Sequence, residues 1–218
     1  QKIKKVVALS TDKAANPINL YGATKLASDK LFIAANNFVG GKKIQFSVVR
    51  YGNVFGSRGS VVPVFCSQLK SKMKYLTITN PKMTRFIITL EQGVNFVIKS
   101  FKRMRGGEIF VPKLPSITVE EIANYMAPNY PKKNIGIRPG EKMHEIMCPS
   151  DDSHNVIEFK DFFIIKPSIQ INNKFNYSKT LLNEKGYSVD LGFEYKSDNT
   201  YKLTKKEFLK MLNQFNED

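Results

Sequence analysis

Apolar and polar positions alternate in blocks that predict an α/β fold. The run Val6–Leu9 is apolar throughout and reads as a short buried strand. Residues Leu20–Asn37 repeat apolar side chains at helical spacing, after Asn19 as a capping residue, and Gly40-Gly41 is expected to close this helix. The elements expected next are strands over 44–49, 76–79 and 108–111 and helices over 61–73 and 90–104. Such alternation is typical of a parallel sheet with crossover helices.

The pattern after residue 111 is less regular. A helix capped by Ser116 or Thr118 is expected to end before Pro128. Short strands are expected over 135–137, 156–159 and 162–165, and a closing helix over 201–215. We expect this part to form a smaller lobe laid over the edge of the sheet.

A polar cluster follows the first strand. Ser10, Thr11, Asp12 and Lys13 stand where that strand ends, and ligands of open α/β sheets bind beyond the carboxyl ends of strands. Tyr21 and Lys25 are four residues apart, so they share one face of the expected helix. A free phenol has a pKa of about 10, and a nearby ammonium favours the phenolate. The spacing therefore predicts a tyrosine that acts as a base on a hydroxyl, against the alternative of a surface ring and a solvated lysine.

Charge and composition narrow the class of protein. The 218 residues carry a formal net charge of +15, and there is no acidic residue between Lys30 and Glu91. A polyanion is attracted to such a segment, and a nucleotide diphosphate and a nucleic acid are the candidates, beside a merely solvated lysine-rich surface. No nucleic-acid-binding motif accompanies the charge. No apolar run reaches the length of a membrane span, and the two distant cysteines, without metal spacing, favour free thiols in a reducing cytoplasm.

The glycine-rich loop Gly52–Gly59 follows one expected strand and precedes a helix. In that position it imitates a dinucleotide-binding fingerprint. The acidic residue expected about twenty positions later is absent, and the loop comes after the Tyr/Lys pair. A secondary loop whose backbone approaches a phosphate or a nicotinamide is the favoured interpretation.

These motifs together resemble a known family. The stretch from Ala8 to Lys25 resembles the inverting UDP-N-acetylglucosamine 4,6-dehydratases, within the extended short-chain dehydrogenase/reductase superfamily. The resemblance continues through 50–61, Met83-Thr84-Arg85-Phe86 and 138–145. Retaining dehydratases carry Thr-Asp-Glu at the strand end, whereas this chain has Thr11-Asp12-Lys13, and membrane-anchored or epimerase-coupled relatives tend to carry Met in place of Tyr21.

The resemblance implies a fold and a division of labour. It implies a Rossmann-type parallel sheet, truncated at its N-terminal side, with a smaller mixed α+β substrate lobe. Residues 1–110 would form the C-terminal part of the NADP-binding Rossmann domain, with some substrate-lobe segments interleaved, and residues 111–218 the substrate-binding lobe and a C-terminal extension. The family's Gly-x-x-Gly-x-x-Gly loop has no counterpart in this sequence, so independent cofactor binding is not expected.

The resemblance also implies a reaction. It is an NADP-dependent loss of water from UDP-N-acetylglucosamine with inversion at C5, a hydro-lyase step that opens pseudaminic acid and surface-glycan biosynthesis. The implied enzyme is cytoplasmic and homo-oligomeric at full length, and it requires no metal, nucleic acid or membrane. Tyr21 would take the 4-hydroxyl proton, Lys25 would hold the phenolate and the nicotinamide ribose, and Thr11 would bond the 4-oxygen. Lys13 would be the base at C5, and Asp12 would protonate the departing 6-hydroxyl.

Binding residues follow from the matched positions. The cofactor would contact Tyr21, Lys25 and the segment Val54, Phe55, Gly56, Ser57 and Arg58. The UDP-sugar would contact Lys13, Tyr21, Asn53, Val61, Thr79, Arg138 and Glu141. Arginines suit a diphosphate because they form charge-assisted hydrogen bonds; Arg85 is a lesser candidate, and His144 and His154 are interpreted as structural. The alternatives are a UDP-sugar 4-epimerase, which would not need the Asp12-Lys13 pair, and a catalytically incompetent fragment.

Overall fold

The computed structural model describes residues 3–39, 43–169 and 175–217. The chain folds into two compact units that it visits in turn. The first unit comprises residues 1–51, 92–113 and 146–195, and the second comprises residues 52–91, 114–145 and 196–218. Each unit has its own hydrophobic core, and each is described separately.

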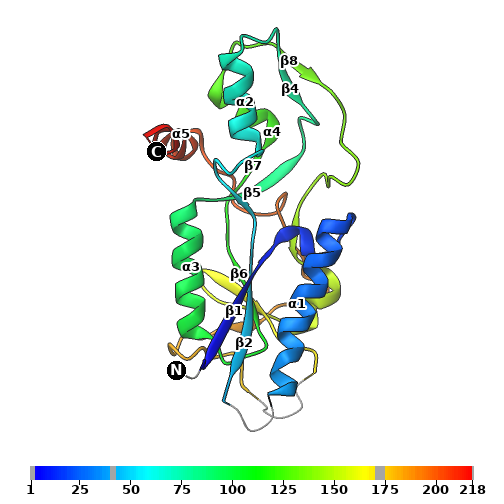
Figure 1. The fold of residues 1–218 in the computed structure, drawn as a ribbon, viewed down its shortest axis with the longest axis vertical. Helices are drawn as coiled ribbons and strands as arrows, with labels where there is room; N and C mark the ends of the chain where they lie inside the picture. The colour runs from blue at the N-terminus through cyan, green and yellow to red at the C-terminus, as the bar shows by residue number, and fades with distance from the viewer. Residues whose placement is uncertain (1–2, 40–42, 170–174, 218) are drawn as a thin grey trace. The chain divides into compact units, whose positions relative to one another are not determined.

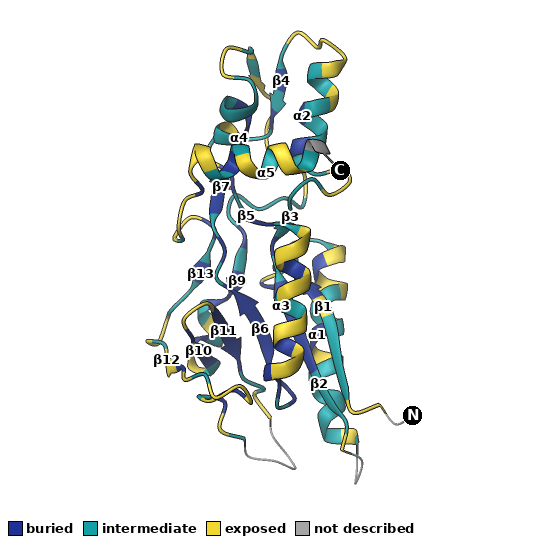
Figure 2. Cartoon of the chain, turned by 90° about the vertical axis from the view of Figure 1, so that its left-hand side faces the viewer, coloured by how far each residue is buried: buried dark blue, intermediate teal, exposed yellow. Residues whose placement is uncertain are grey.

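The first unit is built on a six-stranded sheet with the order β1-β2-β6-β11-β10-β12 (Figure 1). Strands β1 (Lys5–Thr11), β2 (Gln45–Tyr51) and β6 (Ile109–Pro112) are parallel. Strands β11 (Phe162–Ile165), β10 (Val156–Glu158) and β12 (Tyr187–Ser188) extend the sheet in antiparallel fashion. Figure 2 shows β6 and β11 as buried over their whole length, so they lie at the centre of the core.

Two helices cover opposite faces of this sheet (Figures 1 and 2). Helix α1 (Leu20–Phe38) packs against β1 and β2. Helix α3 (Leu90–Arg103) packs Phe96 and Val97 against the cluster that contains Val49 and Phe110. Helices on both faces of parallel strands confirm the expected α/β class. A short 3₁₀ turn, η1 (Asp12–Ala14), joins β1 to α1, and a second, η2 (Ser150–Asn155), precedes β10.

The second unit combines small sheets with three helices. Strands β3 (Asn53–Val54), β5 (Thr84–Ile88) and β7 (Ser116–Thr118) form one sheet, and β4 (Leu76–Ile78) pairs with β8 (Lys132–Asn134). Helices α2 (Val61–Lys70), α4 (Val119–Met126) and α5 (Lys205–Glu217) enclose a core that includes Phe65, Ile122 and Phe208. In the first unit, the short strand β9 (Ile146–Cys148) pairs with β13 (Tyr195–Lys196), which begins at the last residue of that unit.

Local sequence rules account for the helix starts. Asn19 caps α1, because its side chain accepts a hydrogen bond from the Gly22 amide at 2.7 Å. Thr118 and Glu121 form a reciprocal capping box at the start of α4, which confirms the cap expected there. Ser116, the other candidate cap, lies in β7. The closing helix begins at Lys205, four residues later than expected, and Gly40-Gly41 lie outside the described residues.

Two expectations for the later part of the chain are wrong. The strand expected over 135–137 lies at 132–134, where the chain pairs with β4. The strands at 156–158 and 162–165 do not lie over the sheet edge, because β11 pairs directly with β6 and β10 with β11. The compact units alternate along the chain, and the expected division at 110/111, with substrate-lobe segments interleaved in the earlier part, stays a prediction. The assignment of a cofactor lobe and a substrate lobe remains a prediction.

Candidate active site

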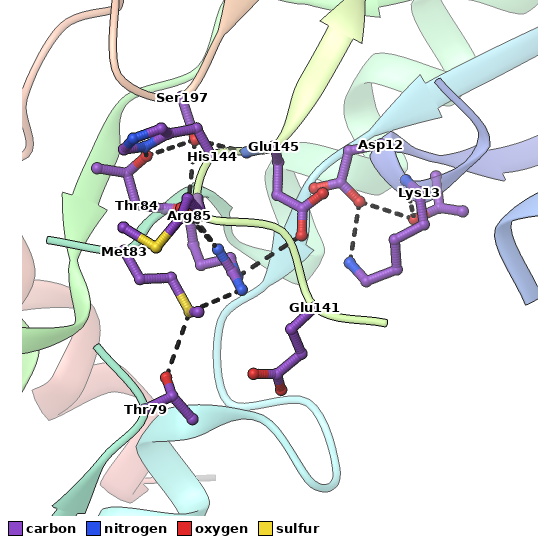
Figure 3. A network of polar contacts seen from close by, with 12 residues as sticks. Asp12, Lys13, Thr79, Met83, Thr84, Arg85, Glu141, His144, Glu145 and Ser197 are labelled. Carbon is purple, nitrogen blue, oxygen red and sulfur yellow. Dashed lines mark hydrogen bonds and ion pairs between the residues drawn. The ribbon is translucent and has the colours of Figure 1, made fainter. Parts of the chain in front are cut away.

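The η1 turn holds Asp12 and Lys13 of the predicted cluster (Figure 3), and Thr11, the last residue of β1, caps the turn. The Asp12 side chain is completely buried, while that of Lys13 is 33% exposed. Lys13 Nζ donates to Asp12 Oδ1 at 3.0 Å, and Thr11 Oγ1 donates to the same oxygen at 2.9 Å. Thr11 Oγ1 also accepts from the Lys13 amide at 3.4 Å, which caps the turn. The Asp12 carboxyl group and the Lys13 amine are therefore in direct hydrogen-bonding contact.

Two buried oxygens near this turn have no hydrogen-bond partner among the described residues. They are Asp12 Oδ2 and Ser10 Oγ. A buried acceptor left unpaired costs about 1–3 kcal/mol, so such atoms call for an explanation. A ligand hydroxyl that donates to Asp12 Oδ2 would supply the missing hydrogen bond.

Helix α1 carries the predicted phenol and amine. The Tyr21 side chain is exposed in the first turn of the helix. Lys25 Nζ donates to the Leu9 carbonyl of β1 at 2.7 Å. The amine is thereby held near the carboxyl end of β1, where the η1 turn begins. The structure brings Thr11, Asp12, Lys13, Tyr21 and Lys25 into one region of the first unit, since α1 packs against η1.

Gly22 allows this close packing. A Cβ at Gly22 would overlap the Lys13 carbonyl oxygen and would lie 3.0 Å from Pro17 Cβ. A larger residue would force the η1 backbone away from the first turn of α1, because a backbone carbonyl cannot rotate aside as a side chain can. The glycine beside Tyr21 thus sets the separation between the two elements that carry the cluster.

The residues predicted to bind the UDP-sugar lie in the second unit. Asn53 is in β3, and its buried Oδ1 has no hydrogen-bond partner among the described residues. The buried Glu141 Oε2 also has no hydrogen-bond partner among the described residues, while Glu141 Oε1 lies 3.9 Å from Arg138 Nη1. Val61 opens α2, and Thr79 Oγ1 contacts Met83 Sδ at 3.3 Å. Two unpaired oxygens and one exposed guanidinium are groups that a polar ligand can satisfy.

The segment predicted to contact the cofactor serves the core of this unit in part. The Phe55 ring packs edge-on against Phe208 and Phe215, and the Phe55 amide donates to the Ile88 carbonyl at 2.8 Å. Gly56 adopts φ +72°, and Phe215 fills the space beside its Cα. Ser57 and Arg58 are exposed. Their side chains, rather than that of Phe55, remain accessible to a ligand.

Sequence reasoning passed over a polar network in the second unit (Figure 3). Arg85 Nε lies 3.6 Å from Glu145 Oε1, and Glu145 is 3% exposed. Thr84 Oγ1 lies 2.8 Å from His144 Nδ1 and 2.6 Å from Ser197 Oγ. The motifs Met83–Phe86 and 138–145 contain Arg85, His144 and Glu145, but nothing in either indicated Ser197, which is more than a hundred residues away from Thr84 in sequence. Within the described residues no group of His, Cys, Asp and Glu could hold a metal ion.

Comparison with known proteins identifies the family. The model of a family described as polysaccharide biosynthesis protein matches residues 1–167. The chain belongs to this family. A Campylobacter jejuni protein named UDP-N-acetylglucosamine 4,6-dehydratase (inverting) is 56% identical over 97% of this chain and 64% of its own length. A Rickettsia canadensis protein named UDP-glucose 4-epimerase is 39% identical over 97% of this chain and 62% of its own length.

A solved structure is also similar to this chain over nearly its whole length. The X-ray structure of Pen from Bacillus thuringiensis superposes with a TM-score of 0.81 and 35% identity, over 99% of this chain and 64% of that chain. The chain thus spans somewhat less than two thirds of the length of these relatives. Among the described residues, every helix is too short or too polar to cross a membrane.

Proposed function

We propose that this chain carries the catalytic cluster of a nucleotide-sugar 4,6-dehydratase that acts on UDP-N-acetylglucosamine and inverts C5. The observation that supports the proposal most directly is the buried Asp12 carboxylate hydrogen-bonded to the Lys13 amine at 3.0 Å. A dehydration needs an acid for the departing oxygen and a base for the adjacent carbon, and these two side chains supply both. The Campylobacter relative, which is named for this reaction, supports the same proposal.

Tyr21 and Lys25 act on the 4-hydroxyl group. Tyr21 is exposed and takes the hydroxyl proton, while Lys25 stabilises the phenolate from four residues along the same helix. Thr11 Oγ1 donates its proton to Asp12 Oδ1, and the single proton of the 4-hydroxyl goes to Tyr21; Thr11 would therefore bond the 4-oxygen by turning its hydroxyl proton from Asp12 toward the substrate. Loss of the 4-hydroxyl proton and oxidation of C4 acidify the hydrogen at C5.

The Asp12–Lys13 pair then removes water across C5 and C6. In its neutral form, with the proton on Asp12, Lys13 Nζ takes the C5 proton and Asp12 gives its proton to the 6-oxygen, which leaves as water. The pair ends as carboxylate and ammonium, joined by the 3.0 Å contact at Oδ1. Release of one proton from the Lys13 ammonium to solvent and uptake of one proton at Asp12 Oδ2, the oxygen outside that contact, would restore the neutral form. A proton delivered to C5 from the opposite face inverts this centre. The protons lost from O4 and C5 balance those taken up by the leaving oxygen and by C5.

The residues of α1 fit a nicotinamide cofactor, which we propose to be NADP. The Tyr21 ring is accessible and the Lys25 amine is fixed beside the carboxyl end of β1, so both suit contacts to a ribose. When bound, the cofactor supplies a hydride acceptor at C4 and a hydride donor at C6. Ser57 and Arg58 would contact its polar groups, with the backbone at 54–56. Arg138, Glu141 and Asn53 would bind the UDP-sugar, with Val61 and Thr79 beside it.

The test uses this chain fused to the part of the Campylobacter relative that has no counterpart here. Binding of NADP by the fusion is the control for assembly. Mass spectrometry of UDP-N-acetylglucosamine incubated with the fusion should show a product lighter by one water. In heavy water the product should carry deuterium at C5, and Lys13→Ala should abolish that exchange. A fusion that binds NADP and releases no water would refute the dehydratase proposal, and exchange retained in the variant would refute the role of Lys13.

A UDP-sugar 4-epimerase is the second candidate, because the Rickettsia canadensis protein named UDP-glucose 4-epimerase is 39% identical over 97% of this chain. An epimerase would use Tyr21 and Lys25 in the same way and would leave Asp12 and Lys13 without a chemical task. Its product has the mass of the substrate. The same mass measurement therefore separates the two functions.

A further inference from the structure

A buried arginine lies between the elements that carry the catalytic cluster. Arg50, near the carboxyl end of β2, pairs in the sheet with Ser10 of β1. Its side chain is 2% exposed. Arg50 Nη2 donates to Asp29 Oδ2 of α1 at 3.1 Å, and Nη1 donates to the Met147 carbonyl of β9 at 2.8 Å. One guanidinium therefore joins a helix to a strand that is distant in sequence.

The hydrogen bond from Arg50 to Asp29 holds helix α1, which carries Tyr21 and Lys25. Tyr21, Lys25 and Asp29 are spaced by four residues, so they lie along one face of α1. The Asp29 side chain is as buried as that of Arg50. Holding Asp29 on the sheet fixes the rotation of α1 about its axis, and with it the direction in which Tyr21 and Lys25 project.

The hydrogen bond from Arg50 to the Met147 carbonyl holds strand β9, which contacts the η1 turn with Asp12 and Lys13. Strand β9 contacts η1, and η1 contacts α1. Arg50 thus holds the strand that supports Asp12 and Lys13 with one nitrogen, and the helix that presents Tyr21 and Lys25 with another. The rigid fork of a guanidinium can make both bonds at once, whereas a lysine ammonium has no such fixed geometry.

Stability alone does not account for this pair. Taking two charges out of water opposes their attraction, so a buried ion pair is weak evidence for stability. Arg50 Nε also has no hydrogen-bond partner among the described residues, which adds to the cost of burial. A less costly apolar contact would fill the same space without fixing a direction.

We propose that Arg50 and Asp29 are positioning residues that set the two halves of the catalytic cluster relative to each other. The inference deepens the proposed function and rests on it for the catalytic roles of the four positioned side chains. The positioning itself is a property of the first unit and is measurable without substrate or cofactor.

The test compares three variants of this chain. Asp29→Asn keeps the shape of the side chain and removes the charge. Arg50→Lys keeps the positive charge and removes the planar guanidinium. It allows the proposal to be tested even if Asp29→Asn folds poorly. Glu184→Gln is the matched control: it removes an ion pair with Arg103 in the same unit, where the two bonds are 2.6 and 2.8 Å. That pair joins α3 to the segment near residue 184 and touches neither α1 nor η1.

The first readout is amide hydrogen exchange, followed by mass spectrometry of peptides. Asp29→Asn and Arg50→Lys should speed exchange in residues 12–26 by about tenfold relative to the strands β6 and β11. Glu184→Gln should speed exchange around residues 100–105 and 180–186 and leave residues 12–26 unchanged. Equal acceleration over the whole unit, or none in residues 12–26, would overturn the proposal.

The second readout is turnover by the fusion protein described above. Misplaced catalytic groups should lower kcat by about ten- to a hundredfold and leave KM within about twofold. A raised KM with unchanged kcat would contradict a positioning role. If the unsubstituted fusion releases no water while the exchange pattern appears as expected, the proposed function fails and the structural link made by Arg50 stands.

Discussion

Gly56 offers a sharp test of how the glycine-rich loop is built. The residue has φ +72°, which is unfavourable for any side chain. A Cβ at this position would also overlap Cδ2 and Cε2 of the Phe215 ring and lie 3.2 Å from its Cγ. Gly56→Ala therefore combines backbone strain with overpacking.

The two effects have separate magnitudes. The left-handed conformation costs a residue with a Cβ about 1–2 kcal/mol. Overpacking of a filled core typically costs a further 1–3 kcal/mol. Phe215 is partly buried and packs edge-on against Phe55 at the side of the core of the second unit, which limits how far its ring can move away. We expect Gly56→Ala to lower the free energy of unfolding by about 2–5 kcal/mol.

Gly59 is the matched control. It has φ +75°, and nothing lies within 4 Å of the Cβ that an alanine would add. Gly59→Ala should therefore show the backbone cost alone, about 1–2 kcal/mol. Urea denaturation followed by circular dichroism measures both variants, and Phe215→Leu in the Gly56→Ala background should recover part of the loss. Equal losses for the two alanine variants would refute the packing explanation and favour a glycine kept for a ligand.

Three further predictions concern thiols, pH and the cofactor. Burial raises the pKa of the Cys148 thiol to about 12, so a disulfide reagent at pH 8 should label only the partly exposed Cys66 until the protein is unfolded; rapid labelling of two thiols would contradict this. Burial also raises the pKa of Glu108. Hydrogen bonds from the Arg105 and Gly106 amides and the Ser47 hydroxyl lower this pKa, but burial has the larger effect. The folded state therefore holds this proton more tightly, and the contribution of Glu108 to stability is present below the unfolded value of about 4.3 and is lost as pH rises through the folded value. Unfolding free energies of the wild type minus those of Glu108→Gln should fall with rising pH, and a flat difference would count against the assignment. Calorimetry should detect weak or no NADP binding by this chain alone, because the sequence has no Gly-x-x-Gly-x-x-Gly loop; micromolar affinity would overturn that expectation.

Local rules predicted the part of the site that depends on short spacings. The cap at Asn19, the start of α1 at Leu20 and the strand before Asp12 each follow from a few neighbouring residues, and the structure confirms all three. The same spacing predicted that Tyr21 and Lys25 share a face, and both lie on the helix as expected. The roles of these residues remain predictions.

Contacts between distant segments escaped the same rules. The apolar run Phe162–Ile165 signalled a strand, yet nothing in it specified pairing with β6, because side-chain alternation fixes a face and not a neighbour. Nothing in the local sequence indicated that Arg50 and Asp29 would pair, and the fold places both in the interior. One signal was present in the sequence. Asp29 continues the four-residue spacing of Tyr21 and Lys25, which places its carboxylate on the same face of the helix.

The unpaired Asp12 oxygen distinguishes the two candidate functions, a dehydratase and an epimerase. Asp12 Oδ1 accepts two hydrogen bonds, whereas Oδ2 is equally buried and has no partner among the described residues. Leaving it so costs about 1–3 kcal/mol, and a fold selected for stability alone would gain from replacing the aspartate. In a dehydration the 6-hydroxyl of the substrate must meet a carboxyl group, and an oxygen left without a partner is ready to receive it. An epimerisation at C4 brings no substrate group that must bind this oxygen. In an epimerase, the free-energy cost of burying Asp12 Oδ2 without a hydrogen bond would serve no catalytic purpose. The orphaned atom therefore favours the dehydratase.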